Sequence, residues 1–386
     1  MTETTRKPAV EVALMTDGHA DSVAEFSRAV WDPGATSEKV RQGRTLAIQS
    51  NPFFPGQDIP TVLFLSDGRV LGYCGSIPVA VWSGGEERRA DWVKGLMVLP
   101  DHRNGPIGFA LVKELLRRLE RPLSLVVGAA PRRLFEALGM TDLGMLPNFL
   151  RLLNSGAVLK RIDLEALGAS GVAPWLARAV RLTQRMGMAP LLGACADATF
   201  RLKRALNSLG GRSFEIDLPT EFPCPAELDA LWQTLRAQIA VSPVRDSRYL
   251  PWRYGSTSEY RIVTVRSGRG LMGFAAVRRP RDDGDPRLKG IRISVLSELL
   301  FPPDRADIAA AIFRGAEVAA HQYGADALLC SASHPAMVTY LPRQGYLRAP
   351  SNLHFMLADK AGRPGLPRDL SAWWITRGDS NADEVF

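Results

Sequence analysis

The sequence predicts a mixed α/β (α+β) protein in which one order of strands and helices occurs twice. The chain has 386 residues, more than twice the length of a typical domain of about 150 residues, so we expect two domains. In each half a hairpin, a third strand, a helix, a further strand and a short helix follow one another. This repeated order, at an offset of about 200 residues, favours two copies of one topology.

The first copy lies between residues 61 and 140. Its expected elements are a hairpin at 61–82, a strand at 86–98, a helix at 107–119, a strand at 123–130 and a short helix at 131–140. Asp67-Gly68 is a typical hairpin turn. Gly95, inside the third strand, predicts a bulge or the close approach of another backbone or a ligand.

The second copy lies between residues 260 and 346. Its expected elements are strands at 260–265, 271–277, 291–299 and 325–332, a helix at 304–323 and a short helix at 335–346. Gly72 in the first hairpin corresponds to Gly273, 201 residues later, and Gly139 after the short helix corresponds to Gly345. We therefore expect domains at 1–157 and 213–386.

The region between the copies, residues 158–212, is expected to be a helical linker. It holds nine Lys and Arg against three Asp and Glu, most of the formal charge of +8 of the whole chain. Arg178, Arg181 and Arg185 recur at helical spacing. Two interpretations stay open: a solvated face of a packed linker, or a basic amphipathic helix in peripheral contact with an anionic membrane.

Composition sets the broad class of the protein. The hydrophobic fraction is 46% and the charged fraction 23%, as in globular proteins. The four cysteines are far apart in the chain, which argues against a zinc site and favours a reducing compartment. No apolar run is long enough to cross a bilayer. We expect a cytoplasmic protein, with contact at the inner membrane as the alternative.

The segment "LMVLPDHRNGPIGFALVKELLRR", residues 96–118, predicts a strand, a loop and a helix that together bind phosphate. Such an arrangement directs backbone N–H groups and the positive end of the helix dipole at one point. Arg103 adds a fixed positive charge. Gly105 is expected to adopt a positive φ, and Gly108 to leave room for a ligand.

This segment resembles the signature of the GNAT superfamily of N-acetyltransferases, a strand ending in Val-x-Pro followed by Arg/Gln-x-x-Gly-x-Gly/Ala and a helix. The matching residues are Val98, Pro100, Arg103, Ile107 and Gly108. "RLFEALGM" resembles a later segment of the same family. The resemblance covers residues 10–153 well and residues 214–360 more faintly, and it implies two tandem acyl-CoA N-acyltransferase-like domains, each a mixed, mostly antiparallel sheet flanked by helices.

The resemblance also implies a cofactor and the residues that hold it. The cofactor would be acetyl-CoA or another acyl-CoA, with its pyrophosphate on the loop and its thioester carbonyl polarised by the strand backbone. The residues that would contact it are Met97, Val98, Arg103, Asn104, Gly105, Ile107, Gly108 and Phe135.

Two departures from the family pattern weaken that expectation. Pro106 stands where the motif has its first glycine, which removes one N–H donor. Phe135 replaces the tyrosine that commonly protonates the departing thiolate. The equivalent loop of the second copy has no glycine and carries Asp304 and Asp307, so we expect that copy to hold no coenzyme, with Asp304 capping its helix.

Asp91 is the candidate base that takes a proton from an attacking amine, because it lies on the strand before the loop. The alternative is a surface residue without a role in the chemistry. Alternation along the strand cannot say whether its carboxylate faces the site.

A cluster of arginines and aromatic residues in the second copy is the candidate acceptor site. Guanidinium groups and aromatic faces suit sugars, carboxylates and phosphates, but they suit a packed domain junction equally well. The candidate residues are Arg248, Tyr249, Trp252, Arg253 and, beyond a later strand end, His334. No second histidine lies at zinc spacing, so no metal site is expected.

The activity that the resemblance implies is therefore acyl-CoA-dependent N-acyl transfer, with N-acetyl transfer as the expected form, to a small-molecule amine such as an amino sugar or a surface-polysaccharide precursor. Transfer to a peptide amine is a related alternative. A non-catalytic scaffold of the same fold is the alternative from another class. Nucleic-acid binding is not expected, because the basic residues lie on linker helices with few interleaved aromatic residues.

Overall fold

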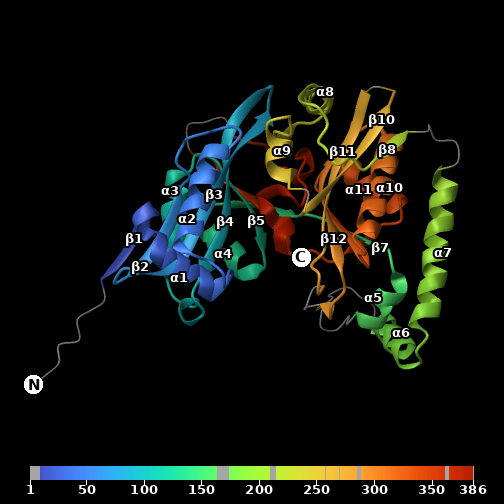
Figure 1. Ribbon diagram of the computed structural model, residues 1–386, viewed down its shortest axis with the longest axis horizontal. Coiled ribbons are helices and arrows are strands. Elements are labelled where there is room, and N and C mark those ends of the chain that lie inside the picture. The colour runs from blue at the N-terminus through green and yellow to red at the C-terminus, as the bar shows by residue number, and fades with distance from the viewer. Residues whose placement is uncertain are drawn as a thin grey trace, which may run out of the picture. The chain divides into compact units, whose positions relative to one another are not determined.

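The computed structural model describes residues 9–162, 174–208, 214–256, 258–268, 270–284, 288–360 and 365–385. The chain folds into two compact units (Figure 1). The first unit contains Met1–Val81, Gly85–Gly144 and Leu353–Leu366, and the second contains Trp82–Gly84, Met145–Asn352 and Pro367–Phe386. Each unit is described separately below.

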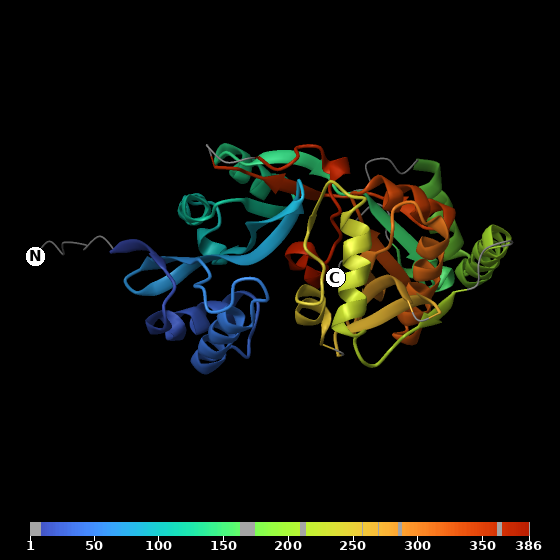
Figure 2. The ribbon, with the colours of Figure 1, turned by 90° about the horizontal axis from the view of Figure 1, so that it is seen from above.

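The sheet of the first unit is mixed and mostly antiparallel, as predicted. Its strands, in spatial order, are β1 (Val10–Leu14), β2 (Thr61–Ser66), β3 (Arg69–Ser83), β4 (Glu86–Val98), β5 (Pro122–Val127), β15 (Leu353–Leu357) and β6 (Thr141–Met145). The helices are α1 (Ala20–Val30), α2 (Ser37–Ser50), α3 (Ile107–Arg118) and α4 (Ala129–Ala137). Figure 2 shows α1 and α2 on one face of this sheet and α3 on the other.

The second unit contains the other sheet, also mixed. Its strands, in spatial order, are β14 (Leu347–Ala349), β7 (Asn148–Leu152), β13 (Ala327–Ser331), β12 (Ile293–Leu300), β11 (Gly270–Arg278), β10 (Tyr260–Ser267) and β8 (Glu215–Asp217), and the short strand β9 covers Val241–Pro243. The helices are α5 (Ser155–Arg161), α6 (Pro174–Arg185), α7 (Ala189–Ser208), α8 (Pro225–Arg236), α9 (Tyr249–Tyr254), α10 (Ala306–Gln322) and α11 (Pro335–Arg343).

The packing of one helix on one glycine repeats in both units. A Cβ atom added to Gly72 would lie 2.7 Å from Cγ2 of Ile107 on α3, too close for any real contact. A Cβ atom on Gly273 would lie 3.0 Å from Cγ2 of Ile308 on α10. Gly273 and Ile308 each follow their counterparts by 201 residues. The shared offset supports the duplicated topology, because glycine lets the helix pack closely on the hairpin in both copies.

Each sheet includes a strand that the other half of the sequence supplies. In the first sheet β15 runs antiparallel to β5, with Leu353 opposite Val127 and Leu357 opposite Leu123. In the second sheet β7 runs antiparallel to β13. The expected ranges 1–157 and 213–386 divide the chain in sequence order, whereas the compact units exchange these two strands.

Two local expectations differ from the structure. Helix α10 begins at Ala306, and its N-cap is Arg305, which makes no capping hydrogen bond through its side chain. Asp304 therefore does not cap this helix. Instead, the guanidinium of Arg305 pairs with the carboxylate of Asp307 at 2.8 Å. The second difference is that helices α1 and α2 form where the sequence predicted no element.

Candidate functional site

The sheet of the first unit divides between β4 and β5. These parallel strands pair only through Asp91 with Pro122 and Trp92 with Leu123. Strand β5 remains paired with β15 up to Val127, so its end is not frayed. The rest of β4, residues 93–98, has no register with β5, although paired strands would lie about 4.8 Å apart. The backbone of β4 that faces this split can therefore hydrogen-bond an extended ligand.

Gly95 lies on β4 within the split. It has a φ of 65°, a conformation that favours glycine, while the bulge or close approach expected here stays a prediction. A Cβ atom on Gly95 would lie 3.4 Å from the ring of Tyr73 on β3. Beyond Gly95, Met97 is 38% exposed, so this end of β4 exposes side chains to solvent.

The loop after β4 leads directly into α3. The first hydrogen bond of the helix runs from Ala110 N–H to the carbonyl of Pro106 at 3.0 Å, and no side chain caps the helix. The N–H groups of Ile107, Gly108 and Phe109 therefore have no partner within the helix. Such N–H groups, together with the positive end of a helix dipole, are of the kind that can bind an anion.

Arg103 is exposed and lies between the end of β4 and the start of α3. Its Nε donates to the carbonyl of Val98 at 3.2 Å, which holds the side chain across the mouth of the split. Gly105 does not have the positive φ expected of it, and its N–H donates to the carbonyl of His102 at 3.3 Å. Pro106 is the N-cap of α3, with an ordinary φ of −77°. The proline stiffens the loop without distorting it.

Phe135, on α4, is buried in the core of the first unit. Its side chain is 3% exposed and belongs to the same cluster as Ile107 and Leu111 of α3. The ring therefore belongs to the core on which the first turns of α3 pack. It has no ionisable group and cannot supply the proton that a tyrosine would.

Asp91 lies at the closed end of the split. Its carboxylate is 1% exposed, Oδ1 accepts no hydrogen bond, and the nearest cation is Arg89, with Nη2 3.7 Å from Oδ1. Burial raises the pKa of this carboxyl to about 6, and Arg89 only partly opposes the rise. A carboxyl with this pKa can accept a proton near neutral pH. Six residues of strand separate it from Met97, about 20 Å if fully extended.

The sequence did not predict that Trp31 and Tyr73 form an aromatic pair near Gly95. Trp31, between α1 and α2, is 45% exposed, and its ring packs edge-on against Tyr73 at 5.6 Å. Phe26 supports Trp31 from α1 at 5.4 Å. The Asp-Pro-Gly sequence after Trp31 signals a turn, but nothing in the sequence places that turn beside β3. Tyr73 brings this aromatic surface next to Gly95.

The corresponding split in the second sheet is filled by the chain itself. Strands β12 and β13 pair from Ile293 to Leu296, and β12 then bulges at Ser297 against β11. Past that point, the N–H of Gly378 donates to the carbonyl of Ser297 at 2.8 Å. On the other side Thr376 forms an antiparallel bridge with Ala332, directly after β13. We call residues 373–379 the C-terminal plug.

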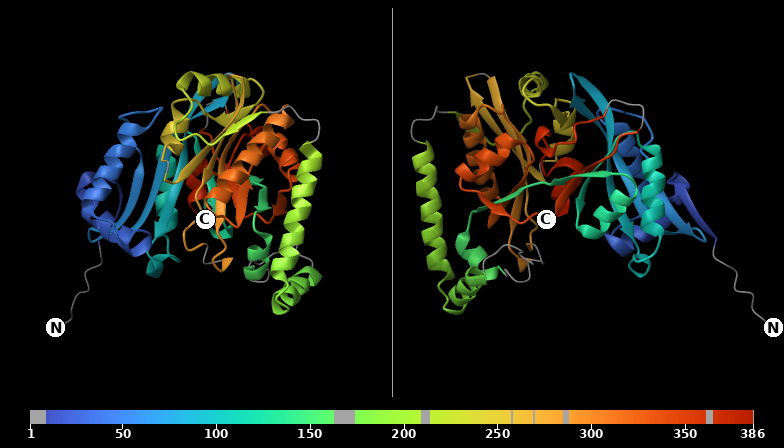
Figure 3. Two further views of the ribbon diagram at one scale, coloured as in Figure 1. Left: turned by 45° about the vertical axis from the view of Figure 1, so that its right-hand side comes forward. Right: turned by 180° about the vertical axis from the view of Figure 1, so that it is seen from behind.

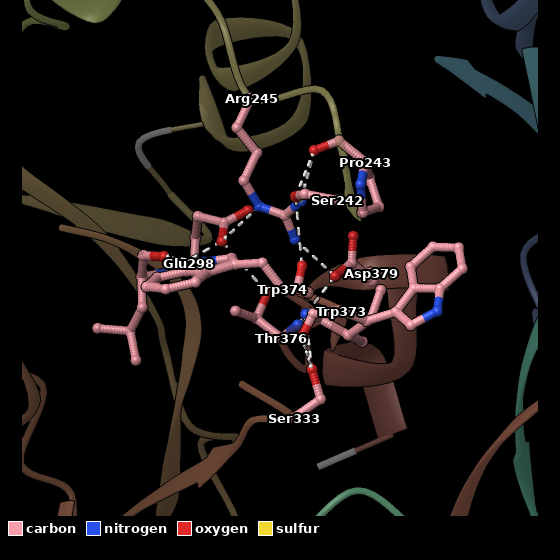
Figure 4. A network of polar contacts seen from close by, with 12 residues as sticks. Ser242, Pro243, Arg245, Glu298, Ser333, Trp373, Trp374, Thr376 and Asp379 are labelled. Atoms are coloured by element: carbon pink, nitrogen blue, oxygen red, sulfur yellow. Dashed lines mark hydrogen bonds and ion pairs between the residues drawn. The ribbon is translucent and has the colours of Figure 1, made fainter. Parts of the chain in front are cut away.

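A buried ionic network anchors the C-terminal plug (Figure 4). Arg245 is fully buried, and its guanidinium contacts Glu298 of β12 at 3.0 Å and Asp379 of the plug at 2.6 Å. Both carboxyl pKa values are raised, primarily by burial, although Arg245 opposes the rise. Thr376 adds a backbone N–H to Asp379 at 2.9 Å. The network holds the plug between β12 and β13 in place.

Two of the five candidate acceptor residues, Arg253 and His334, contact this plug, and Tyr249 and Trp252 contact each other. Tyr249 is 3% exposed and contacts the ring of Trp252. Arg253 pairs with Asp383 at 2.6 Å and donates to the carbonyl of Gly378. These contacts have the character of a packed junction, the alternative that the sequence left open.

Arg248 and His334 differ in their accessibility. Arg248 is the more accessible, with its side chain 45% exposed and paired with Asp246. His334 caps α11, accepting from Ala336 N–H at 3.3 Å, and its ring packs on Trp374 at 4.9 Å. Burial lowers the pKa of His334 to about 4, so the imidazole is neutral at physiological pH.

Comparison with known proteins relates the chain to others through structure rather than sequence. No family model and no curated protein sequence matches it. The fold is similar to a probable N-acyltransferase from Enterococcus faecalis V583, with a TM-score of 0.55, 11% identity and coverage of 90% of this chain and 72% of that one. It is also similar to a GCN5-related N-acetyltransferase from Kribbella flavida, with a TM-score of 0.52, 14% identity and coverage of 92% and 72%.

A third similar structure is the N-myristoyltransferase of Saccharomyces cerevisiae with bound myristoyl-CoA. The TM-score is 0.55 at 12% identity, over 92% of this chain and 84% of that one. All three similarities extend across both units, and the sheet divided between β4 and β5 agrees with the resemblance found in residues 96–108. The chain therefore has the fold of the GNAT superfamily of N-acetyltransferases, present in two tandem copies.

Proposed function

We propose that this protein is an N-acyltransferase that moves an acyl group from acyl-CoA to an amine, with the acyl-CoA bound to the first unit alone. The split between β4 and β5 is the observation that carries the proposal, since β4 has no register with β5 beyond Trp92 and leads to the first N–H groups of α3, which have no partner within the helix. In the second unit the equivalent space contains the C-terminal plug, and Asp307 lies in the first turn of α10.

The residues of the first unit fit an acyl-CoA. The edge of β4 from residue 93 to Val98 would hydrogen-bond the pantetheine arm, while Arg103 and the N–H groups of Asn104, Ile107 and Gly108 would bind the pyrophosphate. Gly105 uses its own N–H inside the loop. Because Pro106 removes a donor to a charged group, we expect binding weaker by about 1.5–3 kcal/mol than for a loop with glycine there.

The reaction requires positioning and one proton acceptor. The amine attacks the thioester carbonyl carbon, a C–N bond replaces the C–S bond, and the CoA thiolate leaves. Backbone N–H groups near Met97 and Val98 would polarise the carbonyl. The proton acceptor would be Asp91, with its pKa near 6, or a relay of water molecules. Asp91 could act only through a chain of several waters, because six steps along β4 separate it from Met97.

The acceptor is proposed to be a small amine with a flat apolar face, such as an amino sugar. Trp31 supports this choice, because an exposed aromatic ring can bind the face of a sugar ring, and its partner Tyr73, which is partly buried, places it near Gly95. The surface-polysaccharide precursor named by the sequence analysis belongs to this class. We place the activity in the cytoplasm, where the four free cysteines would stay reduced.

Release of free CoA thiol, measured with the purified protein, tests the proposal. Acetyl-, octanoyl- and myristoyl-CoA would each be offered with an amino sugar or a peptide that has a free N-terminal amine. Amine-dependent thiol release with the sugar supports the proposal, and Trp31→Ala should then raise KM for the sugar without changing the affinity for acyl-CoA. Thiol release with the peptide but not with the amino sugar would show that the acceptor is a peptide amine rather than a sugar. Absence of thiol release with every pair would favour the scaffold.

A further inference from the structure

The α6–α7 hairpin of the second unit exposes an unusual group of apolar side chains. Among the described residues, fifteen large hydrophobic side chains are exposed, and five of these fall between residues 182 and 192. They are Leu182, Met186, Met188, Leu191 and Leu192, and we call them the apolar tip. Isolated exposed apolar residues are common, but a contiguous group marks a surface that binds something.

The apolar tip is held in place by contacts at its base. Gln184 on α6 donates to the carbonyls of Leu159 at 2.8 Å and Ile162 at 2.9 Å, at the end of α5. Helix α7 crosses α5 so closely that a Cβ atom on Gly193 would lie 2.2 Å from the backbone nitrogen of Gly156. Figure 3 shows α5, α6 and α7 together along one edge of the second unit. The exposed side chains therefore belong to a packed hairpin rather than a frayed end.

The second sheet in turn fixes α5. Val158 is 4% exposed and belongs to a core cluster with Ile291, Ile293, Ala327 and Leu329. This cluster connects the hairpin to β12 and β13 through α5. The apolar tip is thus presented at a fixed place on the second unit, as a binding surface requires.

The charged residues of the described helix α6 are all arginines. The sequence has no Asp or Glu from residue 166 to residue 196, and the next carboxylate on α7, Asp197, accepts a hydrogen bond from Ser155 N–H at 3.3 Å. Arg178 and Arg185 are exposed on α6, within one or two turns of Leu182. Exposed apolar side chains beside exposed arginines match the chemistry of an anionic lipid surface, where the apolar groups enter the headgroup boundary and the cations bind phosphates.

We propose that the apolar tip docks the protein on the surface of an anionic membrane. No described helix is long and apolar enough to span a bilayer. In the docked state the tip side chains would insert into the headgroup boundary of the bilayer, and the arginines would be attracted to the anionic lipids. Each cation near the surface should strengthen binding about fivefold. The proposal does not depend on the acyl transfer proposed above, since it uses other residues.

Vesicle sedimentation tests the proposal with the full chain. We expect binding to phosphatidylcholine vesicles that contain about 30% phosphatidylglycerol and no measurable binding to phosphatidylcholine alone. Salt at about 0.5 M should weaken the binding by screening the arginines. Leu182→Gln with Met186→Gln and Leu191→Gln should lower binding at least tenfold, and Arg178→Glu with Arg185→Glu should lower it by a similar factor.

Matched controls separate docking from general effects of these changes. Leu46→Gln removes a side chain as exposed as Leu191, at 65% against 62%, and Arg69→Glu with Arg348→Glu changes the same net charge elsewhere. Both controls should bind like the wild type. Equal binding to neutral vesicles, equal losses in the controls, or no binding at all would overturn the proposal. Concentration-dependent dimers in light scattering that the glutamine variant abolishes would instead make the tip a protein interface.

Discussion

The indole N–H of Trp374 donates a hydrogen bond of 2.9 Å to the carbonyl oxygen of Leu299. Leu299 follows Val98 by 201 residues, and the Val98 carbonyl accepts from Arg103 at the mouth of the first split. Equivalent strand ends thus bind different partners in the two copies. In the second unit the partner is the chain's own plug, which occupies the space that the first unit leaves for a ligand.

Truncating Trp374 tests whether the plug is structural. Its side chain is fully buried, so Trp374→Ala should lower the free energy of unfolding by about 3–5 kcal/mol. Acyl-CoA affinity should stay unchanged, because the first unit alone is proposed to bind it. Urea unfolding and calorimetric titration measure the two quantities, with Trp31→Ala, at an exposed tryptophan, as the control for stability. A weaker acyl-CoA affinity would show that the plug shapes the cofactor site.

Removing Arg245 should lower the free energy of unfolding, because two buried carboxylates would lose their shared cation. Arg245→Met leaves Glu298 and Asp379 without their shared cation and should destabilise the protein by about 3–5 kcal/mol near pH 7. Because burial raises both pKa values, protonation relieves the unpaired charge, and the loss should shrink as pH falls. Arg248→Met, which removes an arginine with a 45% exposed side chain, should cost less than Arg245→Met. Equal losses in the two variants, or a loss independent of pH, would contradict this account.

Replacing the glycine under α3 or α10 by alanine should destabilise the protein, because the added methyl group would collide with the helix. Gly273→Ala would place Cβ 2.6 Å from Cδ1 of Ile312, and we expect a loss of about 1–3 kcal/mol in unfolding free energy. Adding Ile312→Val removes that Cδ1 and should recover part of the loss. Gly43→Ala is the control, since a Cβ atom there meets nothing within 4 Å on an exposed helix face, and it should stabilise slightly. Thermal melts compare the three, and a stable Gly273→Ala protein would refute the packing argument.

Asp91 should impose a pH dependence on acyl transfer. If it accepts the proton, kcat/KM should rise about tenfold per pH unit below its pKa of about 6 and level off above it. Asp91→Asn should remove that step and lower the rate at pH 7 by roughly 100-fold or more. A pH profile of Asp91→Asn that still rises through pH 6 would assign the proton transfer to another group.

The stability of the same variant separates a base from a structural residue. The pKa of Asp91 is raised on folding, so its stabilising effect is present below pH 4 and is lost as pH rises toward 6, by about 3 kcal/mol in total. Asp91→Asn should fold at least as stably as the wild type at pH 7, because it no longer buries a charge. Loss of both activity and stability in Asp91→Asn would indicate a structural role.

The sequence anticipated the local elements better than their long-range pairing. Periodicity and turn residues predicted the hairpins, the strand with Gly95 and the helix from Ile107, because these depend on residues close in the chain. The exchange of β7 and β15 joins residues about 180 to 230 apart, and neither strand has a distinctive pattern. The fold class was therefore predictable, but the composition of each sheet was not.

The candidate site shows the same limit. The loop motif identified Arg103 and the start of α3, because a phosphate-binding turn is formed by consecutive residues that a sequence motif can detect. Trp31 and Tyr73 could not be paired without the structure. Sequence composition alone does not show that Arg253 and Asp383 pair, so it cannot distinguish an acceptor site around Tyr249 from a packed junction.

Calorimetric titration of the protein with acetyl-CoA tests the central claim most directly, with Arg103→Glu beside it. We predict one binding site per chain with a Kd in the micromolar range, roughly, and loss of binding in Arg103→Glu. Arg133→Glu, an equal charge change on an exposed residue of α4, is the control for general electrostatics. Two sites per chain would contradict the filled second split. Unchanged binding in Arg103→Glu, or none by wild type up to millimolar acetyl-, octanoyl- or myristoyl-CoA, would contradict the proposed site.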